Sequence, residues 1–451
     1  MITALKTQQQ KNHPIGLEFL TKEQLLSYFQ DSWELYEWLF SAVKNDETYY
    51  ESPDPLRNPL VFYLGHTAAF YINKMVLAGL LKEGINAHYE EIFAKGVDPN
   101  LPEHLEVRDL WPSIREVRAY RAAVKSVIET CLEEQFYPCN VNDKHPLWAI
   151  FMGIEHDRIH FETSSVLIRQ LEPSKVERPE DWLYAPSLGK APQNKIIPCP
   201  GGTAVIGKPQ NASIFGWDNE YGMLTQEVAP FEASQNLITN EEFLEFYNSG
   251  AYNDQQNWTE EGWAWKERTN TTHPRFWVKD GDEFTYRAMF DELPMPLDYP
   301  VEVNAHEAWA YCNWKGEGWR LLSEAEFHTI AHNEIKDTDC AFDDAYNLNV
   351  KYGSPTPVGA MELAQSELGF NDLFGNVWDW LNDDFYPLPG FEIHPLYEDF
   401  SAPYFDQEHS MMLGGAWATT GTGASKYYRL WFRRHFYQHA GFRIARTLIE
   451  A

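Results

Sequence analysis

The sequence has few cysteines, few basic residues and no long uninterrupted hydrophobic run. Its five cysteines, an odd number among 451 residues, stand at positions 131, 139, 199, 312 and 340 without closely spaced pairs. This pattern favours free thiols in a reducing cytoplasm over a disulfide framework. The 36 Lys and Arg residues are outnumbered by 67 Asp and Glu residues, giving a formal net charge of −31. Such an excess of negative charge argues against nucleic acid or an anionic membrane surface as a partner.

The start of the chain also lacks the apolar segment of a secretory signal, because residues 1–10 are mostly polar. The only stretch long enough to cross a membrane covers residues 60–81, and His66, Asn73 and Lys74 interrupt it. Polar and charged side chains inside such a run are typical of a buried bundle helix. We therefore expect a soluble, cytoplasmic protein without a membrane partner.

Residues 1–175 carry the pattern of four amphipathic helices. Capping boxes at Thr21 and Ser113 mark two of the starts, because each is followed three residues later by Gln or Glu. The helices are expected over 21–43, around His66 as far as Gly84, from 113 onward, and over 146–171. Four helices of this kind predict an antiparallel bundle, a fold that places metal ligands on facing helices.

Two histidines in the last of these helices have the spacing of metal ligands. His156 and His160 are four residues apart, so an α-helix places both imidazoles on one face. Glu162 lies roughly 200° around the helix from His160 and points away on an ideal helix. The best third ligand is His66, which also interrupts an apolar helical run. Three imidazoles suit iron, copper or zinc, whereas a lone buried histidine is more often a hydrogen-bonded core residue.

The same segment is close to the zinc-protease pattern H-E-x-x-H, with Asp157 in place of the glutamate. The aspartate is one methylene shorter, which would draw a general base away from a metal-bound water. A protease is therefore the weaker interpretation of this helix.

The second half of the chain is built differently from the first. Prolines punctuate residues 176–198, which predicts a linker, and residues 199–451 contain short strand-like segments, Gly-rich turns and 12 of the 17 tryptophans. Helices are expected to begin at Thr239, Asn304 and Ser323, each followed by an acid at the third position. We expect a two-domain α+β protein, with the helical bundle in residues 1–175 and the second domain in residues 199–451.

A cluster of arginines stands near the end of this acidic chain. Arginines in such a cluster either pair with surface carboxylates or hold a carboxylate-bearing substrate through two parallel hydrogen bonds. The sequence leaves both roles open for residues 429, 433, 434, 443 and 446.

Taken together, these motifs resemble those of a known enzyme family. The N-terminal half resembles the DinB-like four-helix bundle, and the C-terminal half resembles the formylglycine-generating-enzyme type of C-type-lectin-like fold. The second resemblance is carried by residues 200–207, 299–301, 319–326, 369–380, 413–417 and 441–443. The two domains together resemble the nonheme-iron sulfoxide synthases of ergothioneine and ovothiol biosynthesis, whose H-x-x-x-H-x-E motif is matched by His156, His160 and Glu162 and whose first ligand is matched by His66.

Within that family the resemblance is closest to the ovothiol branch, the 5-histidylcysteine sulfoxide synthases. It is carried by residues 65–74, 153–171 and 432–443, and by Ile159, where ergothioneine-branch proteins usually have Gln. The resemblance implies an Fe(II) site that uses O2 to join cysteine to the imidazole of histidine as a sulfoxide. It also implies that a tyrosine of the second domain donates a proton or an electron, with Tyr404 the first choice and Tyr397 the second. Arg443 and Arg433 are the expected substrate-binding residues.

Other functions stay open at this point. One alternative is an ergothioneine-type synthase acting on hercynine with cysteine or γ-glutamylcysteine, and the sequence does not exclude a selenium donor. Another is a non-catalytic, metal-containing ligand-binding protein. No cysteine follows Cys340, so the two-cysteine chemistry of the formylglycine-generating enzymes is not expected. Ovothiol synthases commonly continue into a methyltransferase domain, and we expect a separate methyltransferase to act on the product here.

Overall fold

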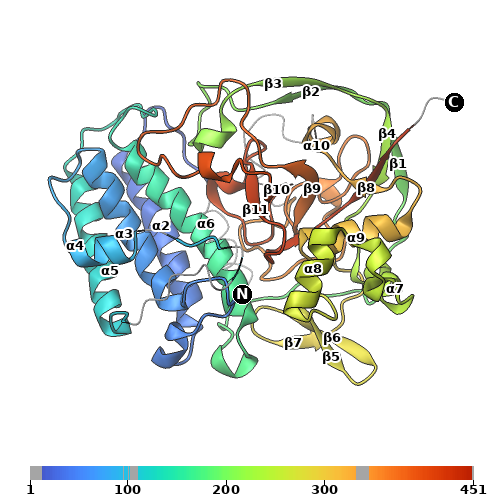
Figure 1. The fold of residues 1–451 in the computed structure, drawn as a ribbon. Helices are drawn as coiled ribbons and strands as arrows, with labels where there is room; N and C mark the ends of the chain where they lie inside the picture. The colour runs from blue at the N-terminus through green and yellow to red at the C-terminus, as the bar shows by residue number, and fades with distance from the viewer. Residues whose placement is uncertain (1–12, 95, 100, 102–109, 332–344, 449–451) are drawn as a thin grey trace.

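The computed structural model describes residues 13–94, 96–99, 101, 110–331 and 345–448. A helical bundle lies beside a mixed region of short strands and helices, and helix α6 runs between the two (Figure 1). The bundle consists of α2 (Lys22–Ser41), α3 (Leu60–Leu77), α4 (Ala87–Ile92), α5 (Ile114–Glu133) and α6 (Trp148–Gln170). Helix α3 packs against both α5 and α6, and α2 packs against α6.

The two capping boxes expected in the bundle are confirmed. The Thr21 side chain accepts from the Gln24 backbone N–H and the Gln24 side chain accepts from the Thr21 N–H, and Ser113 and Glu116 form the same pair of bonds. These bonds satisfy donors that a helix start leaves without partners. The bundle helices therefore begin where the local sequence predicts.

The expected end of the second helix is wrong. Helix α3 ends at Leu77, and Gly79 follows with a φ of 75°, a conformation that glycine adopts without strain. Gly84 instead leaves room for the Glu90 carboxylate, because a Cβ at position 84 would lie 1.8 Å from Glu90 Oε2. Glu90 accepts the backbone N–H of Ile85 at 2.7 Å and thereby orders the turn into α4.

The second domain combines four sheets with four short helices among the described residues. The sheets have the strand orders β1-β4-β13-β8, β11-β10-β9-β12, β2-β3 and β5-β6-β7. Their strands are β1 (Ile196–Cys199), β2 (Gly202–Ile206), β3 (Leu224–Val228), β4 (Phe231–Ser234), β5 (Trp277–Asp280), β6 (Glu283–Arg287), β7 (Glu292–Pro294), β8 (Arg320–Leu321), β9 (Trp378–Asp384), β10 (His409–Leu413), β11 (Leu430–Arg433), β12 (Ala440–Gly441) and β13 (Ile444–Thr447). The pairs are antiparallel except for β9 with β12, which run parallel.

Three of the helices in this domain begin at the expected caps. Thr239, Asn304 and Ser323 each close a capping box with the glutamate three residues later. These helices are α7 (Asn240–Asn248), α9 (Ala305–Lys315) and α10 (Glu324–Ile330). Helix α8 (Glu260–Thr269) was not expected, because its cap Thr259 is followed at the third position by Gly262, which has no side chain to complete a box.

Candidate metal centre and substrate cavity

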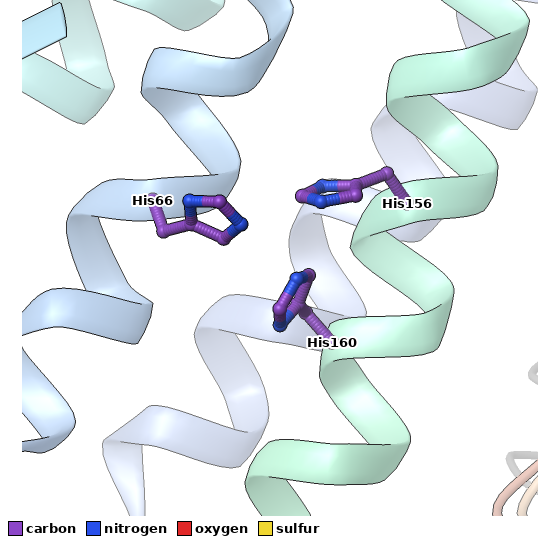
Figure 2. Close-up of side chains that lie close together, drawn as sticks. All are labelled: His66, His156 and His160. Atoms are coloured by element: carbon purple, nitrogen blue, oxygen red, sulfur yellow. The ribbon is translucent and has the colours of Figure 1, made fainter. Parts of the chain in front are cut away.

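Three imidazoles meet where α3 packs against α6. His156 and His160, one turn apart on α6, face His66 on α3 (Figure 2). Their ring centroids are 4.4 to 4.9 Å apart. One nitrogen of each ring lies within 4.8 Å of the ligand nitrogens of the other two. The structure thus brings together the three histidines selected from the sequence, and their binding of a metal stays a prediction.

All three imidazoles are held in the neutral form. Burial lowers the pKa of His66 to about 4. Burial also holds the pKa of His156 and of His160 well below the ordinary value, and the neighbouring imidazoles lower both further. Neutral imidazole is the form that offers a lone pair to a metal, so no proton has to leave the site before a metal binds at neutral pH.

The surroundings of the rings fix their orientation. His66 Nδ1 lies 2.6 Å from the Phe93 carbonyl oxygen, so Nδ1 carries the proton and donates a hydrogen bond to that oxygen. The lone pair on Nε2 is therefore free to bind a metal. Phe70 stacks on His156 with ring centroids 3.6 Å apart. The buried Nδ1 atoms of His156 and His160 have no hydrogen-bond partner among the described residues. Buried nitrogens without a hydrogen-bond partner in an apolar setting cost free energy. A metal ion bound by these imidazoles would offset that cost.

Two of the three imidazoles border a cavity of about 480 Å³ between the two domains. The bundle contributes His66 and His160, and the second domain contributes Tyr397, Tyr404 and other aromatic side chains. A pocket of this size can enclose two small molecules and keep them from bulk water.

The two candidate tyrosines occupy different positions in this cavity. The Tyr397 ring lies 6.3 Å from the His156 ring and 5.1 Å from the Phe70 ring, measured between centroids. The Tyr404 ring instead packs 5.1 Å from His409. Burial raises the pKa of both phenols, that of Tyr404 to about 12, so both are protonated at neutral pH. Tyr397, the second choice from the sequence, is the one beside the imidazoles.

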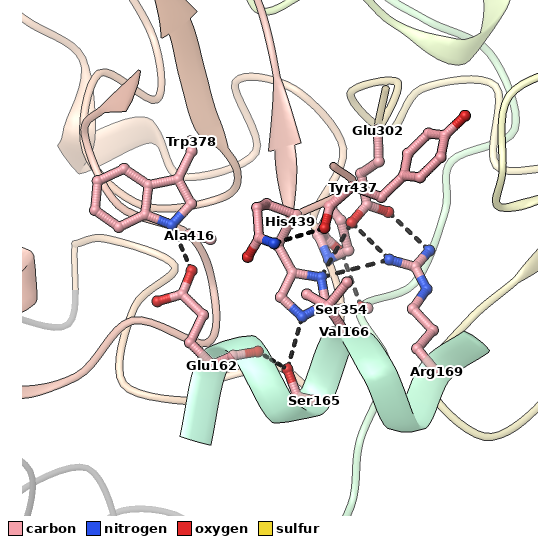
Figure 3. A network of polar contacts seen from close by, with 12 residues as sticks. Glu162, Ser165, Val166, Arg169, Glu302, Ser354, Trp378, Ala416, Tyr437 and His439 are labelled. Atoms are coloured by element: carbon pink, nitrogen blue, oxygen red, sulfur yellow. Dashed lines mark hydrogen bonds and ion pairs between the residues drawn. The ribbon is translucent and has the colours of Figure 1, made fainter. Parts of the chain in front are cut away.

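The opposite face of α6 is anchored in the second domain. Glu162, Ser165 and Arg169, together with Glu155 two turns earlier, form a buried row that we call the polar stripe of α6. Figure 3 shows Trp378 Nε1 donating to Glu162, and Ser165 Oγ sharing a hydrogen bond of 2.8 Å with His439 Nε2. The Thr419 hydroxyl also donates to Glu162. Burial raises the pKa of Glu162 to about 7 against the effect of its two donors.

The contacts of Glu162 place it outside the imidazole cluster, as the helix geometry predicted. The remainder of the stripe was not anticipated from the sequence. Its only local signal is the run of polar residues at helical spacing in an otherwise apolar helix, and that signal does not name a partner.

The two arginines expected to bind substrate are engaged elsewhere. Arg443 is fully buried and donates to Asp379 at 2.9 Å and to the backbone carbonyls of Gln235 and Asp372. Arg433 donates to Asp98 at 2.7 Å and pairs with Glu408. Neither is among the described residues that line the cavity. Their substrate-binding role stays a prediction that this geometry does not support.

Two other cationic side chains line the cavity, and neither was expected from the sequence to bind substrate. Lys74 lies on α3 and Arg57 in the loop before that helix. The spacing of His66, Phe70 and Lys74 by four residues places Lys74 on the helix face that carries the candidate ligand, which is a usable signal. The sequence gives no such indication for Arg57, because residues in a loop have no regular spacing from which a common face could be predicted.

No helix of the described chain combines the length and the hydropathy that a membrane-spanning helix requires.

Comparison with known proteins gives two family matches. Residues 185–448 match the model of the sulfatase-modifying factor enzyme 1-like domain, and residues 28–164 match that of the DinB superfamily. These matches confirm the fold class predicted from the sequence, a DinB-like helical bundle followed by a domain of the formylglycine-generating-enzyme type. The domain boundaries predicted at residues 175 and 199 stay predictions.

Several curated proteins are similar to the chain, two of them over most of its length. "Ergothioneine biosynthesis protein 1" of Schizosaccharomyces pombe is 26% identical over 90% of this chain and 53% of its own length. "Hercynine oxygenase" of Mycolicibacterium smegmatis is 27% identical over 83% of this chain and 87% of its own length. "Hercynine oxygenase" of Mycobacterium tuberculosis is 30% identical over 51% of this chain and 55% of its own length. The chain thus spans little more than half the length of the Schizosaccharomyces pombe relative.

Proposed function

We propose that this chain, which belongs to the family of the sulfatase-modifying factor enzyme 1-like domain, is an O2-dependent, nonheme Fe(II) sulfoxide synthase. The observation that carries the proposal is the group of three neutral imidazoles, two of which, His66 and His160, line a cavity between the domains. The names of the relatives, hercynine oxygenase and ergothioneine biosynthesis protein 1, support the same class of reaction. The enzyme would join the sulfur of a cysteine to the imidazole ring of a histidine derivative.

The proposed reaction balances without a further reductant. A thiol R–SH, an imidazole C–H and O2 give an imidazolyl sulfoxide and one water. Formation of the C–S bond removes two electrons from the substrates, and oxidation of sulfur to the sulfoxide removes two more. The four electrons reduce O2, of which one oxygen atom enters the sulfoxide and the other leaves as water.

His66, His156 and His160 would hold the iron, which supplies the binding of thiolate and the activation of O2. Three protein ligands leave positions open for both. The Phe93 carbonyl keeps the His66 lone pair directed at the site, and Phe70 holds the His156 ring in place. Tyr397 lines the cavity with its ring 6.3 Å from that of His156, and its protonated phenol would donate a proton or an electron there. The enclosing aromatic walls limit the entry of water.

The relatives' names favour hercynine as the imidazole substrate, as in an ergothioneine-type synthase. One observation favours histidine, the substrate of the ovothiol-type reaction, as a second candidate. Ile159, which stands where ergothioneine-branch proteins usually have Gln, lines the cavity directly. An aliphatic side chain there offers no hydrogen bond to the imidazole ring of a bound substrate.

The test is O2 consumption by the Fe(II)-loaded protein with cysteine or γ-glutamylcysteine and with either hercynine or histidine, followed by product masses. A sulfoxide adduct of one imidazole substrate, formed with one equivalent of O2, is the expected result. The preferred imidazole substrate decides between the two candidates. Tight binding of these compounds without O2 uptake would instead identify a metal-containing binding protein.

A further inference from the structure

The cavity is lined by two cations, Lys74 and Arg57, that form no close ion pair with a described carboxylate, although the charge of Asp399 acts on Lys74 and that of Arg57 acts on Asp98. Lys74 makes neither a hydrogen bond nor an ion pair with the described residues, and its Nζ lies 4.0 Å from the centroid of the Tyr397 ring. Arg57 donates one hydrogen bond, from Nη1 to the Val97 carbonyl at 3.1 Å, and its guanidinium stacks 3.7 Å above the Phe436 ring. The remaining N–H donors of both side chains are therefore available to a ligand.

This is unusual in a chain where acids outnumber bases by 31. Other arginines near the cavity, Arg433 and Arg434, are each paired with two carboxylates. A partly buried cation without a close ion-pair partner costs free energy, and burial lowers the pKa of Lys74 to about 8 against the opposing effect of the Asp399 carboxylate. Aromatic faces offset part of that cost, and an anionic ligand would offset more.

The two cations approach the imidazoles from different sides. Lys74 lies two turns beyond His66 on α3, and its charge acts on His66 and His156. The charge of Arg57 acts on His160. Each imidazole of the group therefore lies within reach of the charge of one of the two cations.

We propose that Lys74 and Arg57 are the carboxylate-binding residues of the cavity, each holding the carboxylate of one amino-acid substrate. The assignment rests on the proposed function, which brings two α-carboxylates into one cavity, and it replaces the two arginines selected from the sequence. Arg57, held flat against Phe436, presents a guanidinium edge suited to two parallel hydrogen bonds with a carboxylate. Lys74 presents a compact point charge beside Tyr397.

The test measures binding without turnover, by anaerobic calorimetric titration of the Fe(II)-loaded protein. The variants are Lys74→Met and Arg57→Met, which remove the charge and keep an unbranched stem. Lys144→Met and Arg115→Met, at exposed positions, are the matched controls. The probes are L-cysteine against cysteamine, and L-histidine and hercynine against histamine, so that each pair differs by the carboxylate.

Loss of a charge-assisted hydrogen bond in a partly buried site is expected to raise the dissociation constant about ten- to a hundredfold. Lys74→Met should do this for one amino acid and Arg57→Met for the other. Neither variant should alter the binding of the decarboxylated probe, and Lys74→Arg should retain most of the affinity. Iron content equal to that of the wild type shows that the site itself is intact.

Three outcomes would overturn the assignment. One is unchanged affinity in both variants, and another is an equal loss for probes with and without the carboxylate. The third is weakening of the same amino acid by both variants, which would contradict one carboxylate for each cation. If the wild type binds none of the probes, the proposed function fails as well, whereas wild-type binding that the variants leave unchanged removes the carboxylate assignment alone.

Discussion

Arg169 and Glu302 form a two-pronged ion pair across the domain interface. Arg169 Nη1 and Nη2 lie 2.6 and 2.8 Å from the two carboxylate oxygens of Glu302, and both side chains are almost completely buried. Arg169 is the last member of the polar stripe of α6, and His156 and His160 stand on the same helix. The second domain therefore holds the helix that carries two of the candidate metal ligands.

Breaking this pair should destabilise the protein strongly. Arg169→Met leaves the Glu302 carboxylate buried without its main partner, which costs about 3–5 kcal/mol of unfolding free energy. The measurement is urea denaturation followed by tryptophan fluorescence. Lys175→Met is the matched control, because the Lys175–Glu51 pair is exposed to solvent and exposed ion pairs contribute little to stability. Equal effects of the two substitutions would contradict a dominant role of the buried pair.

The same pair predicts an acid-sensitive component of stability. Burial alone would raise the pKa of Glu302, but Arg169 and His439 bring it down to about 2 from an ordinary value of 4.5. A carboxyl with a lowered pKa in the folded state stabilises the protein fully above its unfolded pKa, and this contribution disappears as the pH falls from about 4.5 to 2. The shift corresponds to about 3 kcal/mol. Stability curves of the wild type and Glu302→Gln should therefore converge over this pH interval, and parallel curves would contradict the prediction.

The sequence predicts the imidazole group well because its information is local. His156 and His160 belong to one helix, their spacing fixes their common face, and His66 interrupts an apolar run that can only be a buried helix. The capped helix starts are predictable for the same reason. The polar stripe and the cavity depend instead on how two domains dock. Glu162 meets Trp378, a residue 216 positions later in the chain, and no local pattern specifies that contact.

The choice of arginines shows the same limit. A cluster of arginines in an acidic chain predicts carboxylate contacts, but the sequence cannot say whether the carboxylates belong to the protein or to a ligand. Arg443 and Arg433 find theirs within the protein. Lys74, which the sequence offered only as evidence against a membrane span, is one of two described cations that line the cavity.

Removal of one imidazole should abolish metal binding and leave the bundle folded. His156→Ala deletes one of three ligands from an otherwise intact pocket, and two neutral imidazoles hold a divalent metal much less tightly than three. Metal content after Fe(II) loading and gel filtration measures the loss, and far-ultraviolet circular dichroism checks the fold. His88→Ala, at an exposed position on α4, is the control and should retain full iron. Full iron in the His156→Ala variant would remove this residue from the ligand set.

The position of Tyr397 predicts which tyrosine controls the outcome of the reaction. Its ring lies beside His156 and Phe70, whereas the Tyr404 ring packs against His409. Tyr397→Phe removes only the phenolic O–H, so the thiol is still oxidised but the C–S bond forms less often. We expect the ratio of sulfoxide adduct to cysteine sulfinate to fall by about tenfold. This is a smaller effect than the roughly 10²- to 10⁴-fold that a positioned proton donor usually contributes to a rate.

Tyr404→Phe is the matched control, since it makes the same chemical change in the same cavity. It should leave the product ratio unchanged, because the hydroxyl that it removes is not beside the imidazoles. Product masses from reactions run to equal O2 consumption measure both variants on one scale. A reversed result, with Tyr404→Phe shifting the ratio and Tyr397→Phe silent, would restore Tyr404 as the donor. It would also mean that the loop carrying both tyrosines, residues 397–404, moves when the substrates bind, because Tyr404 would have to approach the imidazole group to act on it.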